Sequence, residues 1–135
     1  MLKIDHIVLE VADPERSAAF YGELLDLAPI RLAEFRAGTV KFPSLRIDEG
    51  SLIDLFPRAM WRGPAAHNPN HLCFATTAEV LAQVKGRLAA RSIAITKVDD
   101  HNFGARGYGR SIYFDDPDGI SIEVRDYPAA GAAGS

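Results

Sequence analysis

Two histidines and two carboxylates occupy equivalent positions in the two halves of this chain. Asp5-His6-Ile7-Val8-Leu9 and Asn70-His71-Leu72-Cys73-Phe74 share one layout, a polar residue, a histidine and an apolar run suited to a strand. A second pair follows at nearly the same interval, with Asp54 closing the segment 50–54 and Glu123 closing the segment 119–123. Two imidazoles and two carboxylates are a ligand set typical of a divalent metal ion. The repeat therefore predicts a metal site that takes one histidine and one carboxylate from each half.

Strand geometry decides whether these four side chains can meet. Side chains alternate between the two faces of a strand, so His6 shares its face with Glu10 and lies opposite the apolar residues of the same segment. His71, Asp54 and Glu123 likewise lie opposite their apolar neighbours. One such residue alone is more often a solvated or hydrogen-bonded side chain than a ligand. Four of them at repeat-related positions favour the metal site, provided that their faces line one shared surface.

The segments between these motifs predict the elements that position them, because apolar residues recur with the period of a helix in two places and of short strands elsewhere. In the first half we predict a strand over 3–11, a helix from 14 to about 27, and strands near 30–36, 39–46 and 51–56. In the second half we predict a strand over 70–76, a helix over about 78–91, and strands near 93–98, 110–114 and 120–126.

This order predicts an α+β protein built from two βαβββ modules in tandem, residues 3–57 and 70–127. The segment 58–69 is rich in proline and glycine and is the expected linker. One module alone leaves a face of its sheet uncovered, so we expect the two to share a concave, U-shaped mixed sheet with the helices outside, within a single domain of residues 1–127. The tail, residues 128–135, has little to bury and is expected to be disordered.

Composition limits the partners. The 135 residues carry a net charge of −3 with no run of lysine or arginine, which disfavours nucleic acid and anionic membranes as partners. No apolar stretch approaches the ~20 residues that span a bilayer, and the N-terminal residues do not resemble a secretion leader. Cys73 is the single cysteine, so an internal disulfide is impossible and a reducing compartment is favoured. We therefore expect a cytoplasmic protein that acts on a small molecule.

The segment 99–109 combines glycines with cations. Arg106 and Arg110 lie in or beside it, and it contains Gly104, Gly107 and Gly109. Such a segment could close over an anionic substrate, or it could be a plain long hairpin. Arg125 should share a strand face with the carboxylate two residues before it.

The chain resembles the vicinal oxygen chelate superfamily, which groups glyoxalase I, methylmalonyl-CoA epimerase, fosfomycin- and bleomycin-resistance proteins and extradiol dioxygenases. The resemblance covers residues 3–127 and rests on four stretches: Asp5-His6-Ile7, the segment 13–21, Asn70-His71-Leu72, and the segment 111–119 leading to Glu123. It implies one bound divalent metal ion (Fe, Mn, Ni, Co or Zn) with four ligands, His6, Asp54, His71 and Glu123, and a homodimer as the assembly.

The sequence indicates the superfamily more clearly than the branch within it. Relatives that use glutathione place a cation where this chain has Glu10, which implies a substrate other than a glutathione adduct. Extradiol dioxygenases carry a histidine near the place of residues 104–106, where this chain has Gly104, Ala105 and Arg106.

Three functions follow. The first is a metal-dependent glyoxalase-like enzyme of lyase or isomerase type, which binds its substrate through vicinal oxygens and uses Glu123 or Asp54 as the catalytic base. The second is an extradiol-type, ring-cleaving dioxygenase with Fe(II) on His6, His71 and Glu123. The third is a non-catalytic binding or antibiotic-resistance protein with an aromatic surface that includes Trp61. In each, the expected substrate contacts are Glu10, Phe56, Arg106, Arg110, Tyr113 and Arg125.

Overall fold

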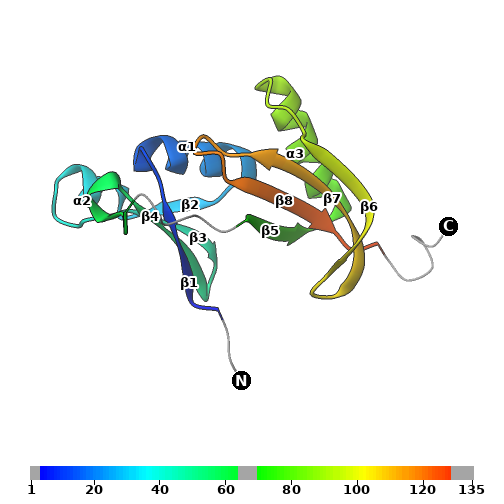
Figure 1. Cartoon of the computed structure of the whole chain (residues 1–135), viewed down its shortest axis with the longest axis horizontal. Coiled ribbons are helices and arrows are strands. Elements are labelled where there is room, and N and C mark those ends of the chain that lie inside the picture. The colour runs from blue at the N-terminus through cyan, green and yellow to red at the C-terminus, as the bar shows by residue number, and fades with distance from the viewer. Residues whose placement is uncertain (1–3, 64–69, 129–135) are drawn as a thin grey trace. The chain divides into compact units, whose positions relative to one another are not determined.

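The computed structural model describes residues 4–63 and 70–128 and divides the chain into two compact units, residues 1–68 and 69–135 (Figure 1). Within the described ranges, no helix has both the length and the apolar character needed to cross a membrane.

The first unit is a four-stranded mixed sheet with strand order β1-β4-β3-β2. Strand β1 pairs with β4 in parallel, and the remaining pairs are antiparallel. Its elements are β1 (His6–Glu10), α1 (Pro14–Leu25), β2 (Ala28–Ile30), α2 (Leu32–Arg36), β3 (Ser44–Asp48), β4 (Ser51–Phe56) and the 3-10 turn η1 (Arg58–Met60).

The second unit repeats this topology. Its sheet has the order β5-β8-β7-β6, with β5 parallel to β8 and the other pairs antiparallel. Its elements are β5 (His71–Thr76), α3 (Ala78–Ala90), β6 (Lys97–Gly104), β7 (Gly107–Asp115) and β8 (Ser121–Asp126). The prediction of two tandem βαβββ modules with mixed sheets is confirmed. The expectation of one shared concave surface concerns the relation between the units and stays a prediction.

In the first unit, two predicted strands were placed wrongly. The segment 30–36 is not one strand, because Arg31 adopts the left-handed conformation with φ of 61° and ends β2 after Ile30. The five residues that follow, Leu-Ala-Glu-Phe-Arg, include good helix formers and make α2. The strand expected over 39–46 begins only at Ser44, directly after Pro43, which has no N–H to donate to a ladder. Helix α1 ends at Leu25, where Asp26 caps it with φ of 57°.

In the second unit, the segment 99–109 is a long hairpin and not a loop. Strands β6 and β7 run through most of it, and the chain reverses at 105–106, next to Gly107 with φ of 98°. Gly104 and Gly109 lie inside the paired strands, where the sequence pattern alone indicated breaks. The strand predicted over 93–98 accordingly begins at Lys97 and extends to Gly104, and the one predicted over 110–114 begins at Gly107.

Each sheet buries one face against its helix. Helix α1 contacts β2, β3 and β4, and α3 contacts β8. Leu9, Leu45, Ile53 and Leu55 are fully buried, and the strand register places them on one face of the first sheet. The second sheet has an equivalent apolar set, formed by Ile112, Phe114, Ile122 and Val124. The alternating residues, among them the four candidate ligands, therefore lie on the face away from the helices.

The start of α1 gives a test of the fold. Asp13 Oδ1 accepts hydrogen bonds from the backbone N–H of Glu15 at 3.0 Å and of Arg16 at 3.3 Å. We expect Asp13→Ala to lower the free energy of unfolding by about 1 kcal/mol, because both donors lose their acceptor. Urea titration measures the change. Asp13→Ser keeps a capping oxygen and should lose much less, and an equal loss in both variants would contradict the capping role.

Candidate functional site

In the first unit, a histidine and a carboxylate face each other across a parallel strand pair. Asp54 on β4 is in register with Val8 on β1, two residues beyond His6 on the same face. His6 Nε2 lies 3.9 Å from Asp54 Oδ2. The other oxygen, Asp54 Oδ1, accepts a hydrogen bond of 2.6 Å from the Ser44 hydroxyl on β3. We call these two ligand candidates the first half-site.

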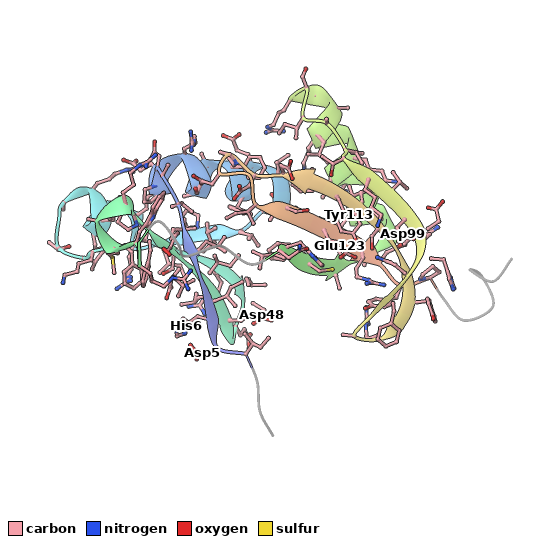
Figure 2. The ribbon with its side chains drawn as sticks, viewed as in Figure 1. Asp5, His6, Asp48, Asp99, Tyr113 and Glu123 are labelled. Carbon is pink, nitrogen blue, oxygen red and sulfur yellow. The ribbon has the colours of Figure 1, made fainter. Side chains whose placement is uncertain are left out.

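The second unit repeats this arrangement, and we call its ligand candidates, His71 and Glu123, the second half-site. His71 Nε2 lies 3.4 Å from Glu123 Oε1. Glu123 Oε2 accepts a hydrogen bond of 2.6 Å from the Ser111 hydroxyl on β7. Figure 2 labels Glu123 and Tyr113, which are directly opposite each other on β8 and β7. In both half-sites, one carboxylate oxygen is thus held by a serine and the other faces the histidine.

The histidine rings are oriented by the residue that precedes each of them. His6 Nδ1 lies 2.7 Å from Asp5 Oδ1, and His71 Nδ1 lies 2.8 Å from Asn70 Oδ1. An oxygen of this kind only accepts hydrogen bonds, so Nδ1 carries the proton in both rings. In the neutral ring, Nε2 then has a lone pair directed toward a carboxylate oxygen. Two electron-rich atoms in this position need a proton or a metal ion between them.

The separations fit a common metal ion. Bonds from a metal to histidine nitrogen or carboxylate oxygen are about 2.0–2.2 Å long, so two ligand atoms of one ion lie roughly 3 Å apart when adjacent and about 4 Å apart when opposite. The distances of 3.9 and 3.4 Å fall in this range. Within residues 4–63 and 70–128, no cluster of three or more histidine, cysteine or acidic side chains is close enough to hold an ion. Each half-site by itself therefore offers two ligands.

Glu123 is the more enclosed of the two carboxylates. It is 3% exposed, and its Oε2 accepts from Asn102 Nδ2 at 3.1 Å and faces Arg125 Nη1 at 3.4 Å, in addition to the serine. Burial raises the pKa of the Glu123 carboxyl. Hydrogen bonds from Ser111, Asn102 and Tyr113 and the charge of Arg125 lower it by more than burial raises it, so the pKa lies below its ordinary value. Glu123 is therefore an ionised, oriented carboxylate.

Three of these donors were not among the predicted site residues. Ser44 and Ser111 are on the strands that pair with the carboxylate strands, so correct register would have identified them. Asn102 could not have been found in this way, because its segment was expected to be either a closing loop or an unspecified hairpin.

Tyr113 lies beside the second half-site. Its ring packs edge-on against His71 with centroids 6.0 Å apart, and its hydroxyl accepts from Asn102 Nδ2 at 3.1 Å. Burial, a hydrogen bond with Glu123 and the charge of Glu123 raise the pKa of the Tyr113 phenol. The phenol therefore stays protonated at neutral pH.

The three predicted arginines have different surroundings. Arg125 is 3% exposed, and its Nη1 lies 3.4 Å from Glu123 Oε2. Arg106 is exposed at the turn of the β6–β7 hairpin, where its guanidinium lies 4.4 Å from the centre of the Tyr127 ring. Arg110 forms an ion pair with Asp126, and its Nε donates to Asp126 Oδ1 at 3.0 Å.

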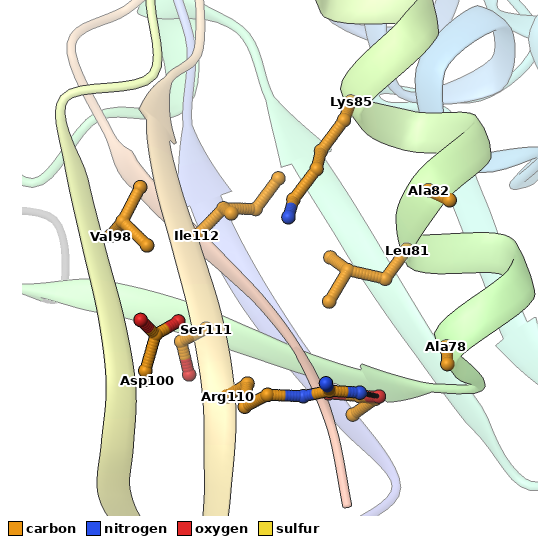
Figure 3. A pocket seen from close by; sticks show the side chains of 10 residues that line it. Ala78, Leu81, Ala82, Lys85, Val98, Asp100, Arg110, Ser111 and Ile112 are labelled. Atoms are coloured by element: carbon orange, nitrogen blue, oxygen red, sulfur yellow. Dashed lines mark hydrogen bonds and ion pairs between the residues drawn. The ribbon is translucent and has the colours of Figure 1, made fainter. Parts of the chain in front are cut away.

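Arg110 belongs to a separate cavity of about 300 Å³ in the second unit (Figure 3). The cavity is lined by Leu81 and Lys85 of α3 and by Ile112 of β7, on the helix side of the sheet. Because side chains alternate along β7, Arg110 lies on the face opposite the one that carries Ser111 and Glu123. Arg110 therefore does not lie on the face of the sheet that carries the second half-site.

The remaining predicted contacts are in the first unit. Glu10 carries a carboxylate that accepts from Arg62 Nε at 2.9 Å and from the Arg62 backbone N–H at 3.2 Å. The hydrogen bond from the Arg62 side chain is the main cause of a lowered pKa at Glu10. Phe56, at the end of β4, packs against Phe42 with ring centroids 4.8 Å apart. Glu10 is thus charged but partly neutralised by a neighbouring cation, which the sequence pattern did not indicate.

Cys73 lies on β5 in register with Glu123, with its residue exposed overall but its sulfur partly shielded from water. Burial of the sulfur and the negative charge of Glu123 raise the pKa of its thiol to about 11. Since the thiolate is the reactive form, Cys73 is not suited to act as a nucleophile.

Comparison with known proteins shows the family and the fold of the chain. The family model of the Glyoxalase/Bleomycin resistance protein/Dioxygenase superfamily matches residues 3–124. Virulence protein STM3117 of Salmonella typhimurium is 32% identical over 129 residues, which cover 93% of this chain and 84% of that protein. The crystal structure of STM3117 superposes with a TM-score of 0.74 over 95% of this chain and 98% of that chain. A glyoxalase/dioxygenase from Nostoc punctiforme is 28% identical with a TM-score of 0.73, covering 93% and 91% of the two chains. The fosfomycin resistance protein FosX from Listeria monocytogenes, at 22% identity, shares the fold with a TM-score of 0.69 over 96% of each chain.

The environment of His6 leads to a pH prediction. The hydrogen bond to Asp5 is the largest cause of a raised pKa at His6, followed by the charge of Asp54. We expect Asp5→Asn, which keeps an oxygen acceptor but removes its charge, to lower the His6 pKa toward its ordinary value of 6.5. A metal ion needs the unprotonated Nε2, so metal binding weakens as pH falls through the His6 pKa, and in the variant this weakening should begin at a lower pH.

NMR titration of the histidine ring protons in the metal-free protein measures the shift. The His71 resonance is the internal control, because Asn70 already occupies the equivalent position there. An unchanged His6 titration in Asp5→Asn would show that Asp5 does not set its protonation.

Proposed function

The chain belongs to the glyoxalase/bleomycin resistance protein/dioxygenase superfamily, and from this premise we propose that it is a divalent-metal-dependent enzyme of the glyoxalase type, acting as a lyase or isomerase on a small substrate with two adjacent oxygens. The observation that carries the proposal is the pairing within each unit, where a histidine Nε2 faces the one carboxylate oxygen that no serine holds.

The proposed ligands are His6 and Asp54 from the first half-site and His71 and Glu123 from the second. Neither half-site has enough ligands to retain an ion by itself, so we propose that both serve one ion, with the two modules taken from one chain or from the two chains of a homodimer. Four ligands leave about two of six octahedral positions for the substrate oxygens. When bound, the ion would supply Lewis-acid stabilisation of negative charge on those oxygens.

The two carboxylates are proposed to have different roles. Among the described residues, Glu123 Oε2 has hydrogen-bond donors from Ser111, Asn102 and Arg125 around it, whereas Asp54 accepts from Ser44 alone. Asp54 can therefore change its position at a lower cost, and it is the better candidate for the base that takes a proton next to a carbonyl group. Ser44 would orient the Asp54 carboxylate during this transfer. Tyr113, which is protonated and adjacent to His71, is a candidate for contact with a substrate oxygen.

A ring-cleaving dioxygenase is the alternative. The separation of 3.9 Å between His6 and Asp54 leaves room for a site in which only His6, His71 and Glu123 bind Fe(II). Extradiol dioxygenases carry a histidine near the place of residues 104–106, and His101 is the histidine of this chain nearest to it in sequence. Against the alternative, the ring of His101 stacks on Tyr108 at 4.1 Å, and Tyr108 lies on the strand face opposite Ser111 and Glu123. Oxygen consumption with catechol-type substrates would favour the alternative over the lyase or isomerase.

Metal content tests the ligand set. We expect the chain, purified without chelator, to retain one divalent ion per chain and the double variant His6→Ala, Glu123→Ala to retain almost none, because each half-site then loses a ligand. Elemental analysis by mass spectrometry measures the content. His101→Ala is the matched control, since it removes a histidine outside both half-sites and should leave the content unchanged. A double variant that binds metal as well as the parent would place the site elsewhere.

Mixing single variants shows which modules combine. If the ion is shared between two chains, co-refolded His6→Ala and His71→Ala chains regain about a quarter to a half of the metal sites, because one of two sites in each mixed dimer is intact. If the site lies within one chain, mixing restores none.

Substrate charge gives a further prediction. Glu10 is ionised and its pKa is lowered by Arg62, so it disfavours an additional carboxylate nearby. We expect the hemithioacetal of methylglyoxal and glutathione to be turned over slowly or not at all, and Glu10→Gln to raise kcat/KM for it severalfold. Steady-state kinetics measure both. Rates typical of enzymes on their own substrates, in the unmodified protein, would contradict this prediction.

A further inference from the structure

The position of Glu123 depends on groups outside the half-site. Its Oε2 lies within hydrogen-bond distance of Ser111, Asn102 and Arg125, at 2.6, 3.1 and 3.4 Å. The Ser111 hydroxyl also lies 3.0 Å from Asn102 Oδ1, but its single proton can serve only one acceptor at a time, and Glu123 Oε2 is the nearer. These donors use the acceptor capacity of Oε2, so Oε1 is the oxygen left to face His71.

Arg125 extends this network to the β6–β7 hairpin. Its Nη2 donates to the Asn102 carbonyl at 2.7 Å and its Nη1 to the Phe103 carbonyl at 3.2 Å. Both carbonyls belong to the edge strand β6, which is separated from β8 by β7. The pairing of β6 with β7 shifts register between Asp99 and Asn102, directly before these carbonyls, and such irregularities re-aim backbone groups. Arg125 thus crosses β7 and holds the backbone of the hairpin.

Two glycines provide the space for this crossing. A Cβ at Gly104 would overlap Arg125 Nη1 and would lie 2.5 Å from the Tyr127 hydroxyl oxygen. A Cβ at Gly109 would overlap the Asp126 carbonyl and would lie 2.9 Å from Arg125 Nη2. Neither glycine has a positive φ, so the backbone conformation does not require them. Gly104 is needed because the guanidinium and the Tyr127 hydroxyl occupy the volume that a side chain would fill, and Gly109 is needed chiefly because the Asp126 backbone carbonyl does.

We propose that Arg125 and Asn102 are positioning residues that make the orientation of Glu123 depend on the β6–β7 hairpin. Gly104 is the point of the hairpin that contacts the Arg125 guanidinium and fixes its position. Arg125 is 3% exposed, so its charge serves this network and is not available to a substrate in solution. The network is defined by distances between side chains of the second unit and does not depend on a bound metal ion. Its effect on metal binding rests on the proposed function, in which Glu123 is a ligand.

Gly104→Ala tests the proposal without substituting Glu123 or any of its donors. The added methyl group meets the flexible ends of Arg125 and Tyr127 rather than backbone, so it should displace the guanidinium while the hairpin stays paired. Gly86→Ala is the matched control, because a Cβ at Gly86 in α3 meets nothing within 4 Å. Asn102→Ala is a second variant that removes a direct donor, and it decides the question if Gly104→Ala does not fold.

The first measurement is Co²⁺ affinity and the visible spectrum of the Co²⁺-loaded full chain. We expect Gly104→Ala and Asn102→Ala to bind about 10- to 100-fold more weakly and with an altered spectrum, and Gly86→Ala to match the parent. If the folded variants bind Co²⁺ with the affinity and spectrum of the parent, while Glu123→Ala does not, the proposal is wrong.

The second measurement uses metal-free protein and separates this proposal from the proposed function. If the parent retains no Co²⁺, or Glu123→Ala binds as well as the parent, the ligand set fails and the network is tested by a double-mutant cycle of Gly104→Ala with Glu123→Gln in urea unfolding. A coupling of at least about threefold in the unfolding equilibrium constant supports the link between hairpin and carboxylate. Additive effects overturn it.

Discussion

A carboxylate held on a central strand, almost out of contact with water, must be compensated by its neighbours, and much of each unit follows from this constraint. Asp54 is 8% exposed and Glu123 is 3% exposed. Each lies on a strand with a neighbour on both sides, β4 between β1 and β3, and β8 between β5 and β7. The antiparallel neighbour supplies a serine hydroxyl to one oxygen, and the parallel neighbour supplies a histidine that faces the other.

The parallel pairing explains why each unit needs its helix. Two parallel strands cannot be joined by a tight turn, so the chain must cross over between β1 and β4 and between β5 and β8. Helices α1 and α3 begin the crossover in each unit and cover the apolar face of the same sheet. The other face carries the half-site. The βαβββ order and the position of the polar residues are therefore two results of one arrangement.

Local signals in the sequence were sufficient for part of this structure. The two histidine motifs, the carboxylates and both main helices follow from alternation, capping residues and repetition, which are properties of short segments. The short helix α2 was missed because the left-handed conformation of Arg31 has no marker in the sequence. The hairpin from 97 to 115 was expected only as one of two alternatives, because Gly104 and Gly109 resemble breaks in a strand. A side chain at Gly104 would instead meet the Arg125 guanidinium, and one at Gly109 the Asp126 backbone carbonyl. Asn102 was not predicted as a site residue because the strand pairing of its segment was left open.

The two units differ most in the hydrogen-bond donors that surround each carboxylate. Asp54 has Ser44 as its hydrogen-bond donor, while Glu123 has a serine, an amide and a guanidinium that is itself tied to another strand. More donors on one oxygen raise the cost of moving it, because each leaves a buried polar group without its partner. A site that takes one carboxylate from each unit would thus combine a rigid ligand with a more mobile one. Proton transfer next to a bound metal ion needs such a difference, since one group must keep the ion in place while the other changes partners.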